Sequence, residues 1–162
     1  MGPIIALCVA VVLIFSAVII AFARRSYKKK TELRRKIKGL AENTLEVSPE
    51  EFMDMRRQYL DGKRNSQNAR ELNFGGVYIL FNKTKNKYYV GQGRKILNRV
   101  NSHFTGKGNG DVYADYKYGD EFTIKMISLE NSGCASLNEL ERLMIAEYDA
   151  CACGYNKTKG NN

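Results

Sequence analysis

The segment GVYILFNKTKNKYYVGQG, from Gly76 to Gly93, decides the fold of this 162-residue chain. Its first part alternates in side-chain position, with Val77, Ile79 and Phe81 on one side of an extended backbone, which is the pattern of a half-buried strand. The polar run KTKNK follows, and KYYVGQG is a second β-rich run that ends in glycine. Two such runs joined by a short turn predict a β-hairpin.

Three further elements are expected after the hairpin. Residues 94–104 have a helical pattern, and EFTIKMISL (residues 121–129) reads as a third strand. The capping box SLNE (residues 136–139) opens a helix that we expect to extend to about Ala150. The order β-β-α-β-α predicts a small domain of the α/β (α+β) class over residues 73–162, in which helices flank a three-stranded antiparallel sheet.

A glycine-rich segment, TGKGNGD (residues 105–111), lies between the predicted helix and the third strand. It is superficially similar to a phosphate-binding loop. It lacks the G-K-[ST] ending and the apolar helix that such a loop requires, so we interpret it as a turn.

The N-terminal region predicts a membrane anchor over residues 1–23. Pro3 to Phe22 are twenty residues without a charge, and at ~1.5 Å per residue a helix of this length spans about 30 Å, enough to cross a bilayer. A cleaved signal peptide is the alternative interpretation. It is disfavoured because no Lys or Arg precedes the apolar run, which ends in Arg24-Arg25 rather than at a small-residue cleavage site.

The next segment predicts the orientation of that anchor. Residues 24–38 contain nine Lys or Arg and one Glu, and such cations stay on the cytoplasmic side of a span. We therefore expect a single-pass protein of the cell membrane with its N-terminus outside and its C-terminal domain in the cytoplasm. Residues 3–22 would contact the lipid bilayer, and the cations would attract anionic lipid headgroups.

Residues 24–72 as a whole read as a basic juxtamembrane segment and helical stalk. Ser48-Pro49-Glu50-Glu51 is a good helix start, and this helix should end near Leu60. Most of the chain's net charge of +9 lies in residues 24–38. Net charge is therefore weak evidence for nucleic-acid binding in this protein.

The cysteines favour neither a disulfide framework nor a structural zinc site. Cys134, Cys151 and Cys153 are an odd number of thiols on the expected cytoplasmic side. A structural zinc ion needs four ligands, and only the single histidine, His103, could complete the set.

Candidate functional residues lie on both predicted helices. Arg99 and His103 are four residues apart and share a helix face, from which they could bind a phosphodiester by hydrogen bonds. Glu141 flanks the apolar stripe of the second helix, where a carboxylate needs a partner or a metal ion. Mg²⁺ suits such an oxygen ligand. From the pattern alone, Glu147 also borders the stripe and remains an alternative.

Six sequence elements, in order, resemble the motifs of the GIY-YIG endonuclease family. Gly76-Val77-Tyr78 is similar to its G-[IV]-Y motif, and Tyr89-Val90-Gly91 to its Y-[IV]-G motif. The resemblance spans residues 75–156 and continues through four single positions: Arg99, His103, Glu141 and Asn156.

The resemblance implies one-step, metal-assisted hydrolysis of a DNA phosphodiester. Tyr78 would help to deprotonate the attacking water, which requires a nearby cation to lower its pKa of about 10. Tyr89 would support that network, and His103 would assist water activation. Some family members carry a second histidine after the first helix. Asn109 and Asp111 lie there in this chain, and neither can be assigned a role from the sequence.

The remaining motif residues would act on the phosphate and the metal. Arg99 would stabilise charge on the pentavalent phosphate, and Glu141 would hold a single Mg²⁺ or Mn²⁺ ion. Asn156 would brace the site, and Gly91 would permit close packing beside the tyrosines.

We therefore expect a membrane-tethered, divalent-metal-dependent DNA endonuclease. A catalytically inactive, membrane-anchored DNA-binding module is the main alternative. A lipid-bound adaptor in which the basic stalk is the functional part is the second alternative.

Overall fold

The computed structural model describes residues 2–62 and 73–161, and for residues 3–12 it describes the backbone alone. The chain divides into two compact units, of which the first ends at Lys36 and the second runs from Ile37 onward.

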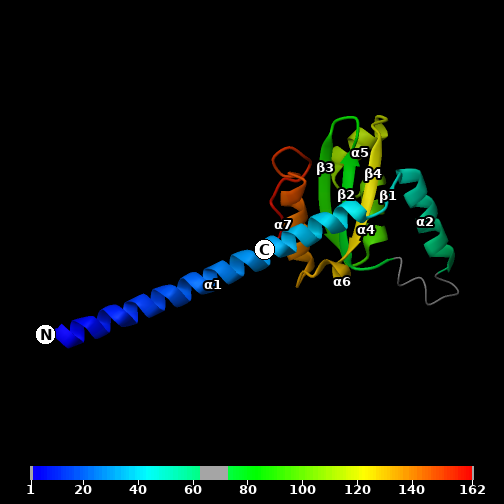
Figure 1. Cartoon of the computed structure of the whole chain (residues 1–162). Coiled ribbons are helices and arrows are strands. Elements are labelled where there is room, and N and C mark those ends of the chain that lie inside the picture. Colours follow the sequence, from blue (N-terminus) through cyan, green and yellow to red (C-terminus); the bar gives the residue numbers. More distant parts are fainter. Residues whose placement is uncertain (1, 63–72, 162) are drawn as a thin grey trace. The chain divides into compact units, whose positions relative to one another are not determined.

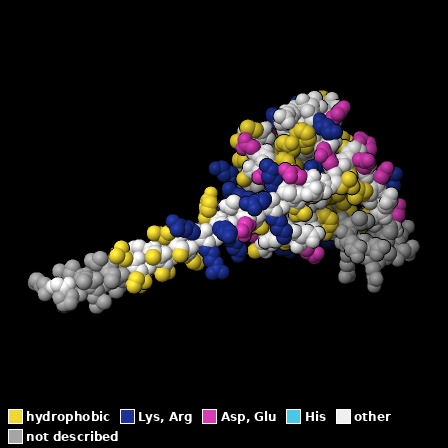
Figure 2. All heavy atoms as spheres, viewed as in Figure 1, with side chains coloured by type: hydrophobic (Ala, Val, Ile, Leu, Met, Phe, Trp, Pro, Cys, Tyr) yellow, Lys and Arg dark blue, Asp and Glu magenta, His cyan; other side chains and the backbone are white. Residues whose placement is uncertain are grey.

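The first unit consists of most of helix α1 (Gly2–Asn43), whose residues 37–43 belong to the second unit. Along its described part, exposed apolar side chains are followed by Lys and Arg (Figure 2). In the described part of the chain, no helix carries an apolar run long enough to cross a bilayer. Residues 3–12, which form half of the predicted span, lie outside the residues whose side chains are described.

The second unit is built on an antiparallel sheet of four strands in the order β1-β4-β2-β3 (Figure 1). The strands are β1 (Glu46–Val47), β2 (Gly76–Asn82), β3 (Lys87–Gly93) and β4 (Phe122–Ser128). The expectation of three strands was wrong, because β1 pairs with the outer side of β4. A strand of two residues is too short to show the alternation by which strands are recognised in a sequence.

The predicted hairpin is confirmed, and its register decides which side chains share a face. Tyr78 lies opposite Gly91, and Leu80 lies opposite Tyr89. Because side chains alternate along a strand, Tyr78, Leu80 and Tyr89 point to the same face. Helices α4 (Ile96–Phe104) and α5 (Gly110–Lys117) contribute to the main core on that face, together with residues of β1, β4, the segment 49–62 and the C-terminal loop.

The opposite face of the hairpin carries Phe81 and Tyr88, whose rings stack at 4.3 Å. Tyr88 also contacts Tyr148, the residue that ends helix α7 (Leu137–Glu147), with ring centroids 4.8 Å apart. The predicted cap of α7 is confirmed, since the Ser136 hydroxyl accepts a hydrogen bond from the Glu139 N–H. A short helix, α6 (Leu129–Ser132), connects β4 to this region.

Residues 37–62 belong to the same compact unit as the hairpin. Helix α2 (Pro49–Gly62) begins with the predicted cap, in which the Glu51 N–H donates to the Ser48 hydroxyl. Ile37 and Phe52 are fully buried, and Phe52 lies in the main core. The expected domain start at Asn73 is thus later than the start of this unit, because the buried residues here are too sparse to form a recognisable apolar stripe.

Candidate active site

Tyr78 lies at the centre of β2, and its side chain is completely buried. Its hydroxyl is 2.8 Å from Nε2 of His103. Gly91 faces it across the hairpin, and a Cβ atom there would overlap the Tyr78 hydroxyl. The expectation that Gly91 permits close packing beside the tyrosines is therefore confirmed.

Tyr89, on β3, is only half-buried and lies beside the same pair. Its ring centroid is 6.1 Å from that of Tyr78 and 4.7 Å from that of His103. Tyr89 is therefore the tyrosine of the pair through which the cluster reaches the protein surface.

Arg99 lies one turn before His103 on α4 and is exposed. Burial strongly raises the pKa of Tyr78, and the neighbouring Tyr89 raises it further, while the charge and hydrogen bonding of Arg99 lower it. Burial also raises the pKa of Tyr89, against which Arg99 and the Tyr78 hydrogen bond act in the opposite direction. Arg99 thus favours the ionised form of both phenols, but burial outweighs it, and the pKa of each tyrosine remains raised.

His103 is fully buried, and its two ring nitrogens face different elements. Nε2 meets the Tyr78 hydroxyl, and Nδ1 lies 2.9 Å from the backbone nitrogen of Asn109. Burial, followed by the positive charge of Arg99, lowers the pKa of His103 to about 4. The ring is therefore neutral at physiological pH.

Glu141 lies on α7 with 7% of its surface exposed. Its Oε2 accepts a hydrogen bond of 2.9 Å from Nε2 of Gln92, which also donates to Oδ1 of Asn138 at 2.7 Å. Glu141 is close enough to Tyr89 for its charge to raise the pKa of that phenol. Glu147, the alternative from the sequence, instead forms an ion pair of 3.6 Å with Lys38.

The surroundings of Glu141 fit a divalent metal ion. Among the described residues, no Lys or Arg forms an ion pair with this buried carboxylate, although a buried charge requires compensation. No group of three or more His, Cys, Asp or Glu side chains suited to a metal occurs in that part of the chain. A single carboxylate is sufficient for Mg²⁺ where waters and substrate phosphates complete its coordination.

Asn156 braces strand β3 at the residue after Tyr89. Its Oδ1 accepts from the Val90 N–H at 2.8 Å, and its Nδ2 donates to the Val90 carbonyl at 2.7 Å. The side-chain amide thus occupies the free edge of β3 as a neighbouring strand would. Asn156 supports the cluster through the backbone.

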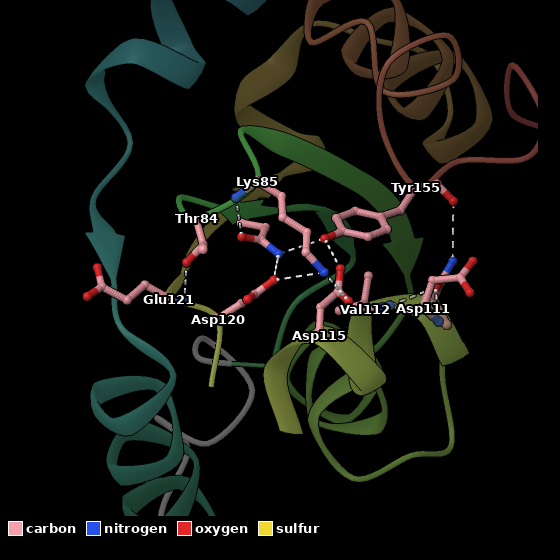
Figure 3. A network of polar contacts seen from close by, with 10 residues as sticks. Thr84, Lys85, Asp111, Val112, Asp115, Asp120, Glu121 and Tyr155 are labelled. Carbon is pink, nitrogen blue, oxygen red and sulfur yellow. Dashed lines mark hydrogen bonds and ion pairs between the residues drawn. The ribbon is translucent and has the colours of Figure 1, made fainter. Parts of the chain in front are cut away.

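A polar network holds the residue before Asn156 (Figure 3). The Tyr155 hydroxyl donates to Asp115 and accepts from Asn82, both at 2.7 Å. The Lys85 ammonium forms ion pairs with the carboxylates of Asp115 and Asp120, at 2.6 and 3.3 Å. This network connects the β2–β3 turn, α5 and the C-terminal loop, and so fixes the position of Asn156.

The structure brings the six predicted residues to one region centred on β3. Tyr78, Tyr89, Arg99 and His103 form a cluster on the core face, while Glu141 is held through Gln92 and Asn156 through Val90.

Two residues that the sequence interpretation did not assign also contribute to this region. Gln92 orients the Glu141 carboxylate, and Asn109 contacts His103. A signal for Asn109 was present, because Asn before Gly-Asp is a good helix cap; none was present for Gln92.

Comparison with known proteins agrees with this geometry. The model of the GIY-YIG catalytic domain matches residues 74–156, which is more than half of the chain. No match was found among curated proteins or among solved structures. The GIY-YIG family comprises nucleases, which act on DNA and typically use divalent metal ions. A hairpin that carries both tyrosine motifs, with the matched domain extending to Asn156, therefore identifies this chain as a member of the GIY-YIG family.

Proposed function

We propose that this protein is an endonuclease that hydrolyses DNA phosphodiester bonds with Mg²⁺ or Mn²⁺. The observation that carries the proposal is the convergence of Tyr78, Tyr89, Arg99 and His103 in one cluster. Family membership supports the nuclease class. The buried Glu141 carboxylate, which forms no ion pair with a described Lys or Arg, supports the metal.

The attacking water would lose its proton to Tyr89, which would enter the step as a phenolate with the Tyr78 hydrogen bond and the Arg99 charge to stabilise it. The water oxygen forms a bond to phosphorus while the bond from phosphorus to the leaving sugar oxygen breaks. Tyr89 is the member of the pair that reaches solvent, whereas Tyr78 is fully buried. We therefore propose that Tyr89 lies next to the water and Tyr78 behind it, which refines the expectation that Tyr78 helps to deprotonate the water.

Arg99 would hold the phosphate. Its guanidinium is exposed and acts on both tyrosine hydroxyls. A phosphodiester bound there would lie next to the tyrosine that receives the proton. As negative charge grows on the phosphate oxygens, a fixed cation at this position stabilises the transition state more than the ground state.

Glu141 would hold the metal ion, with Gln92 fixing the orientation of its carboxylate. When bound, the divalent ion neutralises the charge that develops on the leaving oxygen. Asn156 would keep the β3 backbone in place beneath Tyr89.

We propose further that the enzyme is tethered to the cell membrane with this domain in the cytoplasm. The uncharged run Pro3–Phe22 and the cations of residues 24–38 support the proposal. The described cations of that segment are exposed (Figure 2), and apart from Lys38, which pairs with Glu147, they would attract anionic headgroups. Protease added outside intact cells should leave the C-terminal domain uncut; its removal would refute the orientation.

Nicking of supercoiled plasmid tests the nuclease. The detergent-solubilised full chain would be incubated with Mg²⁺, Mn²⁺ or EDTA, beside Arg99→Ala, Glu141→Ala and the control Glu147→Ala, whose residue is paired with Lys38. We expect metal-dependent nicking that is lost in the first two variants and kept in the control. If the folded protein binds DNA but cuts none of it with either metal, the DNA-binding module becomes the better account.

A further inference from the structure

We infer that Asn109 is a positioning residue that locks His103 in one tautomer, so that His103 donates a hydrogen bond to Tyr78 and does not act as a base. The inference rests on the proposed function, because it concerns the same site. Three features hold this tautomer: the backbone N–H of Asn109, the cap that the Asn109 side chain forms on α5, and the close approach of Gly108 to the ring.

The tautomer follows from the two partners of the ring. The Asn109 backbone nitrogen lies 2.9 Å from Nδ1 of His103. A backbone N–H can only donate, so Nδ1 must carry a lone pair. A neutral imidazole has one proton, which is therefore on Nε2. The Tyr78 hydroxyl oxygen, 2.8 Å away, must then accept a hydrogen bond from Nε2–H.

The surroundings of His103 keep the ring neutral. The side chain is fully buried. The titratable groups that face it are Tyr78 from β2, Tyr89 from β3 and Arg99 from its own helix. None of these provides a negative charge to stabilise an imidazolium, and Arg99 opposes one. The pKa of about 4 agrees with this arrangement.

Asn109 is itself held by contacts on both sides. Its Oδ1 accepts from the backbone N–H groups of Asp111 and Val112 at 2.9 and 3.1 Å, and so caps α5. Its Nδ2 donates to the Tyr155 carbonyl at 3.3 Å. The side chain thus fixes the direction in which its backbone N–H points.

Gly108 lets this loop approach the ring. A Cβ atom at Gly108 would lie 2.6 Å from Nδ1 of His103 and 2.9 Å from its Cα. These separations are shorter than van der Waals contact allows, so a side chain here would move the loop and the Asn109 N–H away from the imidazole.

The Nε2–H tautomer of His103 decides which group donates and which accepts in each hydrogen bond of the cluster. They run from the Asn109 N–H to Nδ1 and from Nε2–H to the Tyr78 hydroxyl. The Tyr78 proton is then free to form the hydrogen bond between Tyr78 and Tyr89. In this arrangement the proton of the attacking water goes to Tyr89, which enters the step as a phenolate that accepts the Tyr78 hydrogen bond, and His103 keeps its own proton throughout.

Nitrogen NMR of the histidine ring tests the tautomer directly. His103 is the only histidine, so the full chain labelled with [¹⁵N]histidine in detergent gives one ring signal for each nitrogen. We expect an unprotonated Nδ1 and a protonated Nε2, unchanged between about pH 5.5 and about pH 8. A protonated Nδ1, averaged shifts, or titration near the ordinary pKa of about 6.5 would overturn the inference.

A matched pair of variants tests the role of Asn109. Asn109→Ser keeps a helix cap, whereas Asn109→Ala removes it. We expect the serine variant to retain the Nε2–H tautomer and the alanine variant to show mixed tautomers. In the alanine variant kcat should fall with KM unchanged, and an acid limb near pH 6.5 should enter the pH profile. Identical spectra from the two variants would overturn the role of the cap.

The NMR result does not depend on cleavage. A locked tautomer in a protein that cuts no DNA would leave the inference standing and remove the proposed function. DNA cleavage by a protein whose His103 shows mixed tautomers would support the proposed function and overturn the inference.

Discussion

Burial of a neutral His103 predicts a specific loss of stability in acid. The pKa of this group is lowered to about 4 in the folded protein, against about 6.5 in the unfolded chain. Between these values the unfolded state binds more protons than the folded state, so the free energy of unfolding falls as the pH falls. The contribution of His103 is fully present above about pH 6.5 and is lost progressively toward pH 4.

The magnitude follows from the size of the shift. From about pH 7 to about pH 4.5, the shift costs about 2–3 kcal/mol of the free energy of unfolding. Replacing the ring by an amide, in His103→Gln, removes the titration. The variant should be less stable than the wild type at neutral pH, and the difference should shrink by that amount as the pH falls.

Urea denaturation followed by circular dichroism at a series of pH values measures both proteins. Carboxylates also titrate near pH 4, but they are the same in the two proteins and cancel in the difference. If the wild type and His103→Gln lose stability in parallel between about pH 6.5 and about pH 4.5, His103 is not held neutral in the fold and the reasoning fails.

Three further outcomes are expected. Gln92→Ala should weaken Mn²⁺ binding, measured by electron paramagnetic resonance, by about 10-fold or more, because the Glu141 carboxylate loses its orienting partner; unchanged affinity would contradict this. Gly91→Ala should cost about 1–3 kcal/mol of unfolding free energy in urea denaturation, since its methyl group meets the Tyr78 hydroxyl, whereas Gly110→Ala, with no atom within 4 Å of the added Cβ, should not. Tyr155→Phe should cost about 1–3 kcal/mol in the same assay by leaving Asn82 and Asp115 without a hydroxyl partner; a neutral effect would mean that the network does not support the C-terminal loop.

The parts of the fold that could be predicted are those with a strong local pattern. The hairpin was visible because alternation, a polar turn and a final glycine coincide between Gly76 and Gly93. The caps at Ser48 and Ser136 were visible because a hydroxyl residue followed three positions later by glutamate has a direct physical meaning. The cluster was expected from the order of its motifs rather than from any pattern in space.

The parts that could not be predicted depend on long-range contacts. Helix α5 contains Tyr113, Asp115 and Tyr116 where an apolar stripe would be expected, and only Val112 is buried. The contact of Gln92 with Glu141 joins residues 49 positions apart, and an isolated glutamine gives no signal of its partner. Asn109 was noticed but not assigned, because its role depends on the direction of a backbone N–H.

The small strand β1 determines where the chain can be shortened. Glu46 and Val47 cover the outer backbone groups of β4 at Lys125 and Ile124, and Phe52 fills the core nearby. A fragment that begins near residue 70 would leave those backbone groups unpaired beside an exposed apolar surface. Sheet edges with unpaired backbone groups pair with one another and cause aggregation, so we expect the truncated protein to self-associate. A lack of nuclease activity in that fragment would then say nothing about the chemistry of the full chain.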